Sequence, residues 1–198
     1  MLRQLSRRNR YLILLVRLLL LGLYFAPLWF VQLTAPQYPE GLGMNLWIHK
    51  ITGLGQFDLQ NINLLNHYVG MDPIIEQAIP EFGYMPYVVA FMILGAVVTF
   101  LYPRRFMVYL GLANLLLVGT AGMWDFWRWE YNYGHHLNPG APISIPGMVY
   151  QPPLLGCKQL LNIESCSWPH LGGYLLFLVT AVLLFVIVSE HSKGTASK

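Results

Sequence analysis

Residues 125–168 read DFWRWEYNYGHHLNPGAPISIPGMVYQPPLLGCKQLLNIESCSW and lie between two strongly apolar stretches of the chain. The segment is rich in Trp, Tyr, His and Pro, whereas a plain linker is rich in Ser, Gly and charged residues. Long loops of such composition are usually folded and carry function. We therefore expect residues 125–168 to form a structured surface beside a membrane.

The composition predicts an integral membrane protein. The chain of 198 residues is 56% hydrophobic and only 11% charged, far less charged than a soluble domain. Four apolar stretches approach the ~20 residues that cross a bilayer. We expect an all-α membrane protein with four transmembrane helices and a small periplasmic cap built from two long loops. Its predicted parts are an N-terminus at 1–10, spans at 11–33, 86–102, 106–124 and 171–189, loops at 34–85 and 125–170, a turn at 103–105 and a tail at 190–198.

The distribution of charge predicts the orientation of these spans. Eight of the nine acidic residues lie in the two long loops, whereas most basic residues lie at the termini or in the short turn. Because Lys and Arg favour cytoplasmic segments, we expect both termini inside the cell and both long loops outside. The basic residues are thus expected to set the orientation of the spans in the membrane, and nucleic acid is not an expected partner. They are Arg3, Arg7, Arg8, Arg10, Arg104, Arg105, Lys193 and Lys198.

The two long loops show local structure. DLQNINLLNHYVGM, from Asp58, has helical spacing, with Asp58 as the expected cap and Gly70 and Pro73 as the expected end. PIIEQAIPEF predicts a second short helix. The stretch from Asn138 to Gly156 is rich in Pro and Gly, which favours extended structure and turns. Its apolar residues indicate that the second loop packs against the first.

Side chains of His, Met and Cys are concentrated in the two long loops. Imidazole, thioether and thiolate groups are ligands that suit copper. His67 and Met71 are four residues apart and share one helical face, while His135 and His136 can converge only on a turn. The candidate metal ligands are His67, Met71, His135, His136 and Met148, with Met44 and His49 as weaker ones.

Structural alternatives stand beside each of these candidates. A loop His usually forms hydrogen bonds, a loop Met usually packs, and no spacing here matches a strong metal signature such as paired CxxC. Acids such as Glu130 suit catalysis, yet a polar outer loop contains such residues anyway. Cys157 and Cys166 lie on the oxidising side, which favours a disulfide. A thiolate pair for Cu(I) is the alternative.

Several functions lack their expected residues. No His lies in the middle of a predicted span, so a haem between helices has no visible ligand. No Asp or Glu lies within a span, which argues against a proton relay. Walker, GxSxG and HExxH motifs are also missing from the sequence, so an accessory protein is favoured over an enzyme.

Three stretches carry a resemblance to a family. APQYPEGL at 35–42, LNHYVGM at 65–71 and YNYGHHLNPGAPISIPGMVYQPPLLGCKQLLN at 131–162 resemble uncharacterised bacterial multi-pass membrane proteins. The genes of that group accompany those of nitrous oxide reductase, its copper-chaperone lipoprotein and its ABC transporter. The resemblance implies an inner-membrane protein that handles copper or helps to assemble a periplasmic copper enzyme. Its implied partners are that enzyme or a copper chaperone, besides membrane lipid.

Two other functions remain open from the sequence. The aromatic, Pro-rich second loop also suits a docking subunit of a membrane-bound enzyme complex that binds no metal. A quinone-reactive or electron-transfer protein is a further alternative, although it lacks haem ligands within the spans.

Overall fold

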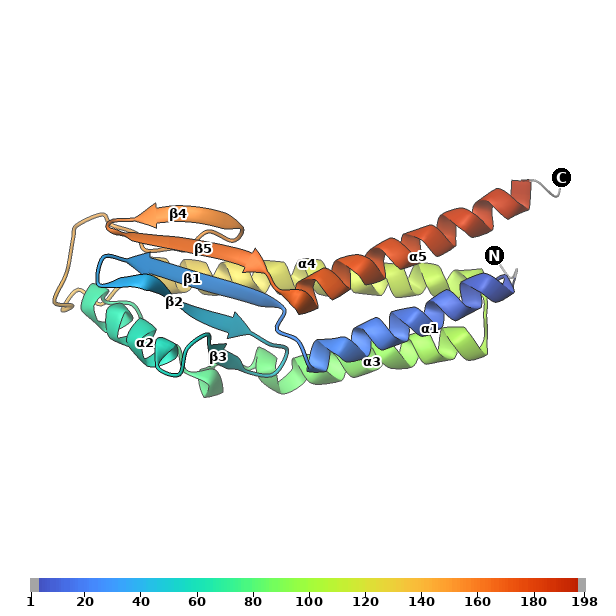
Figure 1. Cartoon of the computed structure of the whole chain (residues 1–198), viewed down its shortest axis with the longest axis horizontal. Coiled ribbons are helices and arrows are strands. Elements are labelled where there is room, and N and C mark those ends of the chain that lie inside the picture. Colours follow the sequence, from blue (N-terminus) through green and yellow to red (C-terminus); the bar gives the residue numbers. More distant parts are fainter. Residues whose placement is uncertain (1–3, 196–198) are drawn as a thin grey trace.

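The computed structural model describes residues 4–195, so Arg3 and Lys198 lie outside the described residues. Figure 1 shows an elongated molecule with a helical bundle at one end and, at the other, a head domain that we define as residues 29–80 and 125–169. The elements are α1 (Arg7–Leu21), η1 (Gly22–Tyr24), β1 (Trp29–Ala35), β2 (Tyr38–Leu46), β3 (Ile51–Gly53), α2 (Asp58–Val69), η2 (Glu76–Ala78), α3 (Glu81–Leu101), α4 (Arg105–His135), β4 (Gly156–Leu160), β5 (Ile163–Pro169) and α5 (Leu171–Thr195).

The head domain contains a β-sheet, so the prediction of an all-α protein is wrong. Five antiparallel strands lie in the order β3-β2-β1-β5-β4. β1 comes from the predicted first span, whose apolar run continues from α1 into the strand without a polar break. Pro27 lies between the two elements, where it disfavours a continuous helix. An apolar run by itself does not distinguish a buried strand from a helix, which explains the error.

The number of predicted spans is also wrong. Within residues 4–195, three helices are long and apolar enough to cross a membrane: α3, α4 and residues 171–192 of α5. α1 has 15 residues, which is about 22 Å of helix, less than the ~30 Å of a bilayer core. It nevertheless packs along α3 and α5, with Ile13, Val16 and Leu20 buried in the bundle core.

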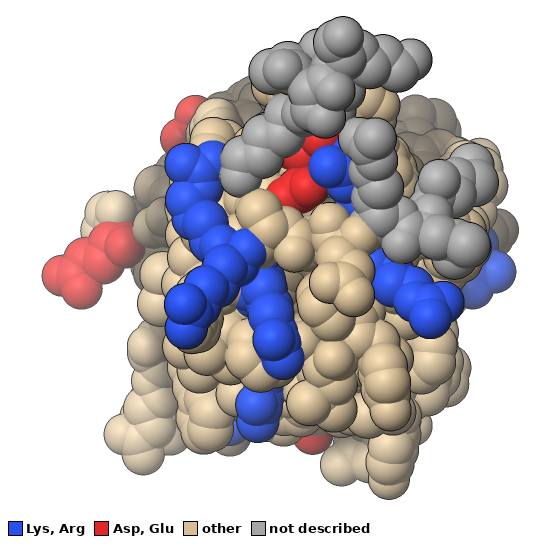
Figure 2. Space-filling model, turned by 90° about the vertical axis from the view of Figure 1, so that its right-hand side faces the viewer, with Lys and Arg blue, Asp and Glu red and all other residues tan. Residues whose placement is uncertain are grey.

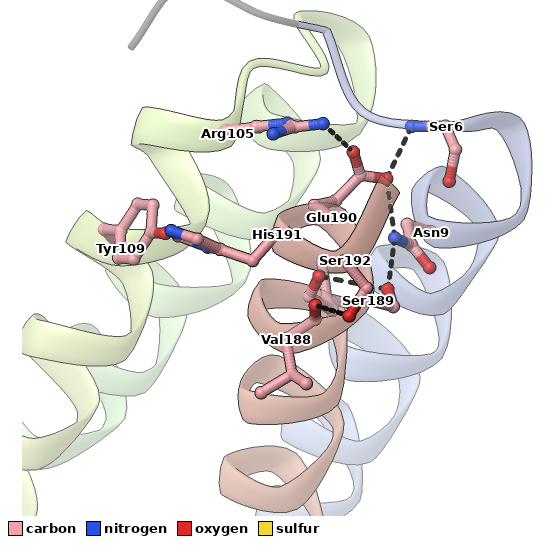
Figure 3. Close-up of polar contacts among 10 residues, drawn as sticks. Ser6, Asn9, Arg105, Tyr109, Val188, Ser189, Glu190, His191 and Ser192 are labelled. Atoms are coloured by element: carbon pink, nitrogen blue, oxygen red, sulfur yellow. Dashed lines mark hydrogen bonds and ion pairs between the residues drawn. The ribbon is translucent and has the colours of Figure 1, made fainter. Parts of the chain in front are cut away.

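A buried polar cluster ties three helices together at the end of the bundle away from the head domain. Glu190 of α5 is only 3% exposed and accepts hydrogen bonds from the Ser6 backbone N–H (2.9 Å) and from Asn9 Nδ2 (2.6 Å). Its second carboxylate oxygen lies 2.8 Å from a guanidinium nitrogen of Arg105, at the start of α4 (Figure 3). We call these four residues the polar lock. They join the N-terminal segment to α4 and α5.

Both halves of the chain build the head domain. The central strand β1 pairs with β2 from the first half and with β5 from the second. On the inner face of the sheet, Val31, Leu42 and Met44 form a core with Ile62 of α2. Phe126, Trp129 and Tyr133 of α4 pack against the same core. The sheet and the two helices therefore form one packed unit.

The local predictions for the first loop are confirmed in part. α2 covers the predicted residues, and Gly70 ends it with a left-handed φ of 84°. Asp58 does not cap the helix, because its carboxylate accepts hydrogen bonds from the backbone N–H groups of Gly55 and Gly43 instead. The second predicted helix is reduced to the short 3₁₀ turn η2.

Candidate functional site

The ends of α2 and α4 meet at the far end of the head domain. The backbone N–H of Asn138 donates to the carbonyl of Gly70 (2.7 Å), and that of Ile143 donates to the carbonyl of Tyr68 (2.9 Å). Gly70 is required here because a Cβ at this position would lie 2.7 Å from the Asn138 carbonyl oxygen. We call this region, residues 67–73 and 133–143, the head junction. It joins segments from both halves of the chain.

Four of the predicted metal ligands lie in the head junction. His67 is exposed in the last turn of α2, with its ring beside that of Tyr68, and Met71 follows the helix end half-buried. His135 ends α4, where its ring stacks on Tyr131 and its Nδ1 lies 2.9 Å from the Tyr131 carbonyl oxygen. That contact leaves Nε2 of His135 for a ligand, and the neighbouring His136 is exposed.

The other predicted ligands lie elsewhere. Met148 is half-buried in the loop between α4 and β4, Met44 is buried in the head-domain core, and His49 lies in the turn between β2 and β3 beside Trp47. Among residues 4–195, the only three His, Cys, Asp or Glu side chains with donor atoms within 4.8 Å of one another are Cys157, Glu164 and Cys166. The head junction thus gathers candidate ligands without forming such a cluster.

The two cysteines form the predicted disulfide. Cys157 of β4 and Cys166 of β5 are opposite each other in the strand register, and their sulfurs are bonded at 2.02 Å. With both sulfurs in this bond, neither is a thiolate that can bind Cu(I). The disulfide therefore joins the edge strand β4 to the rest of the sheet.

We expect the Cys157→Ser, Cys166→Ser variant to unfold more easily than the wild type. A cross-link over so short a loop reduces the conformational entropy of the unfolded chain. It should therefore contribute about 2 kcal/mol to the free energy of unfolding. Denaturant unfolding in detergent, followed by tryptophan fluorescence, measures the loss. Wild-type protein kept in reductant should shift by a similar amount. An unchanged midpoint in both samples would contradict a stabilising role for the bond.

Glu130 is a buried acid that the sequence did not reveal. It is 1% exposed on α4, and neither carboxylate oxygen has a hydrogen-bond partner among the described residues. α4 has 31 residues and is about 46 Å long, which exceeds the ~30 Å of a bilayer core. Its last turns, with Trp129 next to Glu130, pack into the head domain beyond the apolar part of the helix. Burial raises the pKa of the Glu130 carboxyl to about 8.

A later part of the second loop lies against α4 one turn beyond Glu130. Gly134, one turn beyond Glu130, accepts a hydrogen bond from the Tyr150 backbone N–H (3.0 Å), and a Cβ on Gly134 would lie 2.4 Å from Gln151 backbone atoms. The Tyr150 hydroxyl and Ser165 Oγ are also buried without a hydrogen-bond partner in the described structure. These buried polar groups come from α4, from the second loop and from β5.

Sequence reasoning missed the burial of Glu130 because it placed residues 125–170 in a polar loop. The helical spacing of Phe126, Glu130, Tyr133 and Gly134 was the available signal, since these residues share one side of a continued helix. A carboxyl with a pKa of about 8 is mostly protonated at neutral pH and can donate a hydrogen bond.

No known protein family, curated protein or solved structure matches this chain.

Proposed function

We propose that this is a membrane accessory protein whose head domain handles copper during assembly of a periplasmic copper enzyme of the nitrous oxide reductase kind. The observation that carries the proposal is the head junction, where backbone hydrogen bonds join the segment that carries His67 and Met71 to the segment that follows His135 and His136. The resemblance of both loops to proteins encoded beside copper-enzyme genes points to the same cargo.

The chemistry of these side chains suits transfer of Cu(I) better than storage. Imidazole and thioether groups are neutral ligands, and soft ligands such as Met favour Cu(I) over harder cations. His67 and His136 are exposed, so an incoming partner protein can reach them. A site of this kind would hold the Cu(I) ion through few ligands and release it to a protein site that binds copper more tightly.

The proposal includes a location in the bacterial inner membrane with both termini in the cytoplasm. Arginine side chains gather at the end of the bundle opposite the head domain, as Figure 2 illustrates. Basic residues favour the cytoplasmic side, so the head domain would lie in the periplasm. A disulfide in that domain is compatible with an oxidising compartment.

A Cu(I) titration against a colorimetric chelator tests the copper role. We expect wild-type protein to compete for one Cu(I), and the His67→Ala, Met71→Ala and His136→Ala variants each to weaken binding by more than ~10-fold, a loss that even supporting residues of metal sites produce. His49→Ala is the matched control, because His49 lies outside the head junction, and it should bind as the wild type does. Equal binding by all variants would reject the proposal.

A second candidate, docking without metal, is favoured by apolar side chains exposed around the head junction. Leu64 and Tyr68 lie one turn apart on α2, and the backbone N–H of Ile143 donates a hydrogen bond to the carbonyl of Tyr68. Leu64, Tyr68 and Ile143 are each between 44% and 48% exposed, and exposed apolar patches often mark protein interfaces. The expected partner is the periplasmic copper enzyme or its chaperone.

Affinity purification from native membranes separates the two candidates. A stoichiometric partner that co-purifies without copper, and is lost in Leu64→Asp but retained in His67→Ala, would support docking alone. A partner whose retention depends on both His67 and added Cu(I) would support copper transfer.

A further inference from the structure

An apolar cavity of about 340 Å³ lies between the helices of the bundle and opens onto its outer surface, where the lining residues Phe91 and Leu110 are exposed. Gly95, Ala96 and Thr99 of α3 face Gly111 and Leu115 of α4 across it, and α1 and α5 contribute further lining residues. The volume falls within the range of natural ligand pockets. Gly95 and Gly111 are exposed at its opening, and a Cβ on either would meet nothing within 4 Å.

The cavity has the depth of one lipid leaflet. It extends along α3 from Phe91 to Thr99 and along α4 from Met107 to Leu115. Eight residues of helix rise about 12 Å, and half of a bilayer core is ~15 Å. Thr99 and Met107 flank the turn between α3 and α4, so the cavity begins near the basic end of the bundle. A single alkyl chain entering from that leaflet matches this depth.

Two arginines lie beside that end of the cavity. Arg10 is one helical turn before Ile13, which lines the cavity, and its Nε donates to the Phe100 carbonyl (2.8 Å), next to Thr99. Arg104 is exposed one turn before Met107. Neither arginine forms an ion pair with a carboxylate in residues 4–195, whereas the neighbouring Arg105 is bound by Glu190. Figure 2 shows that cationic side chains dominate this end.

We propose that the cavity binds one acyl chain of an anionic phospholipid, and that Arg10 and Arg104 hold its phosphate. Basic pockets between helices at the cytoplasmic side are a known arrangement for anionic lipid headgroups. The acyl chain would fill apolar space that α3 and α4 leave open, and the arginines would gain the anion that the protein does not supply. The lipid would thus complete the packing of α4 on the bundle, independently of any role of the head domain.

Native mass spectrometry of the full-length protein, with thermal unfolding in detergent, tests this proposal. Dipalmitoyl phosphatidylglycerol should remain bound at one molecule per chain and raise the unfolding temperature more than phosphatidylcholine with the same chains. Arg10→Gln and Arg104→Gln should each reduce the preference for phosphatidylglycerol by about fivefold, the usual contribution of one basic residue near anionic lipid. Arg128→Gln, in the head domain, is the matched control and should preserve the preference.

A second variant tests the cavity itself. Gly111→Leu places a side chain in the open space, so it should abolish retention of the acyl chain while leaving the arginines in place. Because Arg104 is exposed, Arg104→Gln should fold normally, and its result decides the question even if Gly111→Leu unfolds. Equal retention of both lipids by the wild type, retention of an isoprenoid quinone instead, or an equal response to inorganic phosphate would overturn the proposal.

Discussion

Replacing Glu130 with glutamine should stabilise the protein at pH 8 and remove much of its loss of stability between pH 5 and pH 8. The carboxyl has a pKa of about 8 in the folded protein, against an ordinary value of 4.5 for a glutamate exposed to water. Between these values the folded state binds the proton more tightly than the unfolded state, so stability is greatest below pH 4.5 and falls as the pH rises through 8. The free energy of unfolding should fall by about 1.4 kcal/mol per pH unit between the two pKa values.

Denaturant unfolding at several pH values, followed by tryptophan fluorescence, measures this dependence. The difference between wild type and Glu130→Gln isolates the carboxyl from histidines that titrate in the same range. Glu164→Gln is the matched control, because Glu164 is an exposed acid of the same head domain and its replacement should leave the slope unchanged. A wild type whose stability rises over this window, relative to Glu130→Gln, would show that Glu130 is ionised in the folded protein.

Replacing Arg105 with alanine should destabilise the bundle by about 3–5 kcal/mol, because it leaves the buried Glu190 carboxylate without its cation. The hydrogen bonds from Ser6 and Asn9 remain, yet they supply no opposite charge. Thermal unfolding in detergent measures the effect. Much of the lost stability should return in Arg105→Ala, Glu190→Gln, since the second change removes the uncompensated charge.

Arg104→Ala is the matched control for this prediction. Arg104 precedes Arg105 in the chain but is exposed and has no carboxylate partner among the described residues. In detergent without anionic lipid, its loss should change the unfolding temperature little. If Arg104→Ala and Arg105→Ala behave alike, the polar lock does not stabilise the bundle.

The sequence was most informative where structure depends on nearby residues. The apolar run at 171–189 lies within α5, and the run at 86–102 lies within α3 except for its last residue, since hydrophobic length alone predicts a helix that can cross a membrane. The helix from Asp58 and its end at Gly70 followed from helical spacing and from a residue that adopts positive φ. The disulfide was predicted from compartment and cysteine count.

Contacts between distant parts of the chain were decided by the tertiary structure. β1 pairs with β5, more than 120 positions away, and that pairing turned the end of an apolar run into a strand. The burial of Glu130 followed from the packing of the end of α4 into the head domain, and the partners of Glu190 come from the other end of the chain. Local sequence sets how a segment partitions between water and lipid. Which segments become neighbours depends on the packing of the whole chain, and that packing joined the end of α2 to the segment after α4.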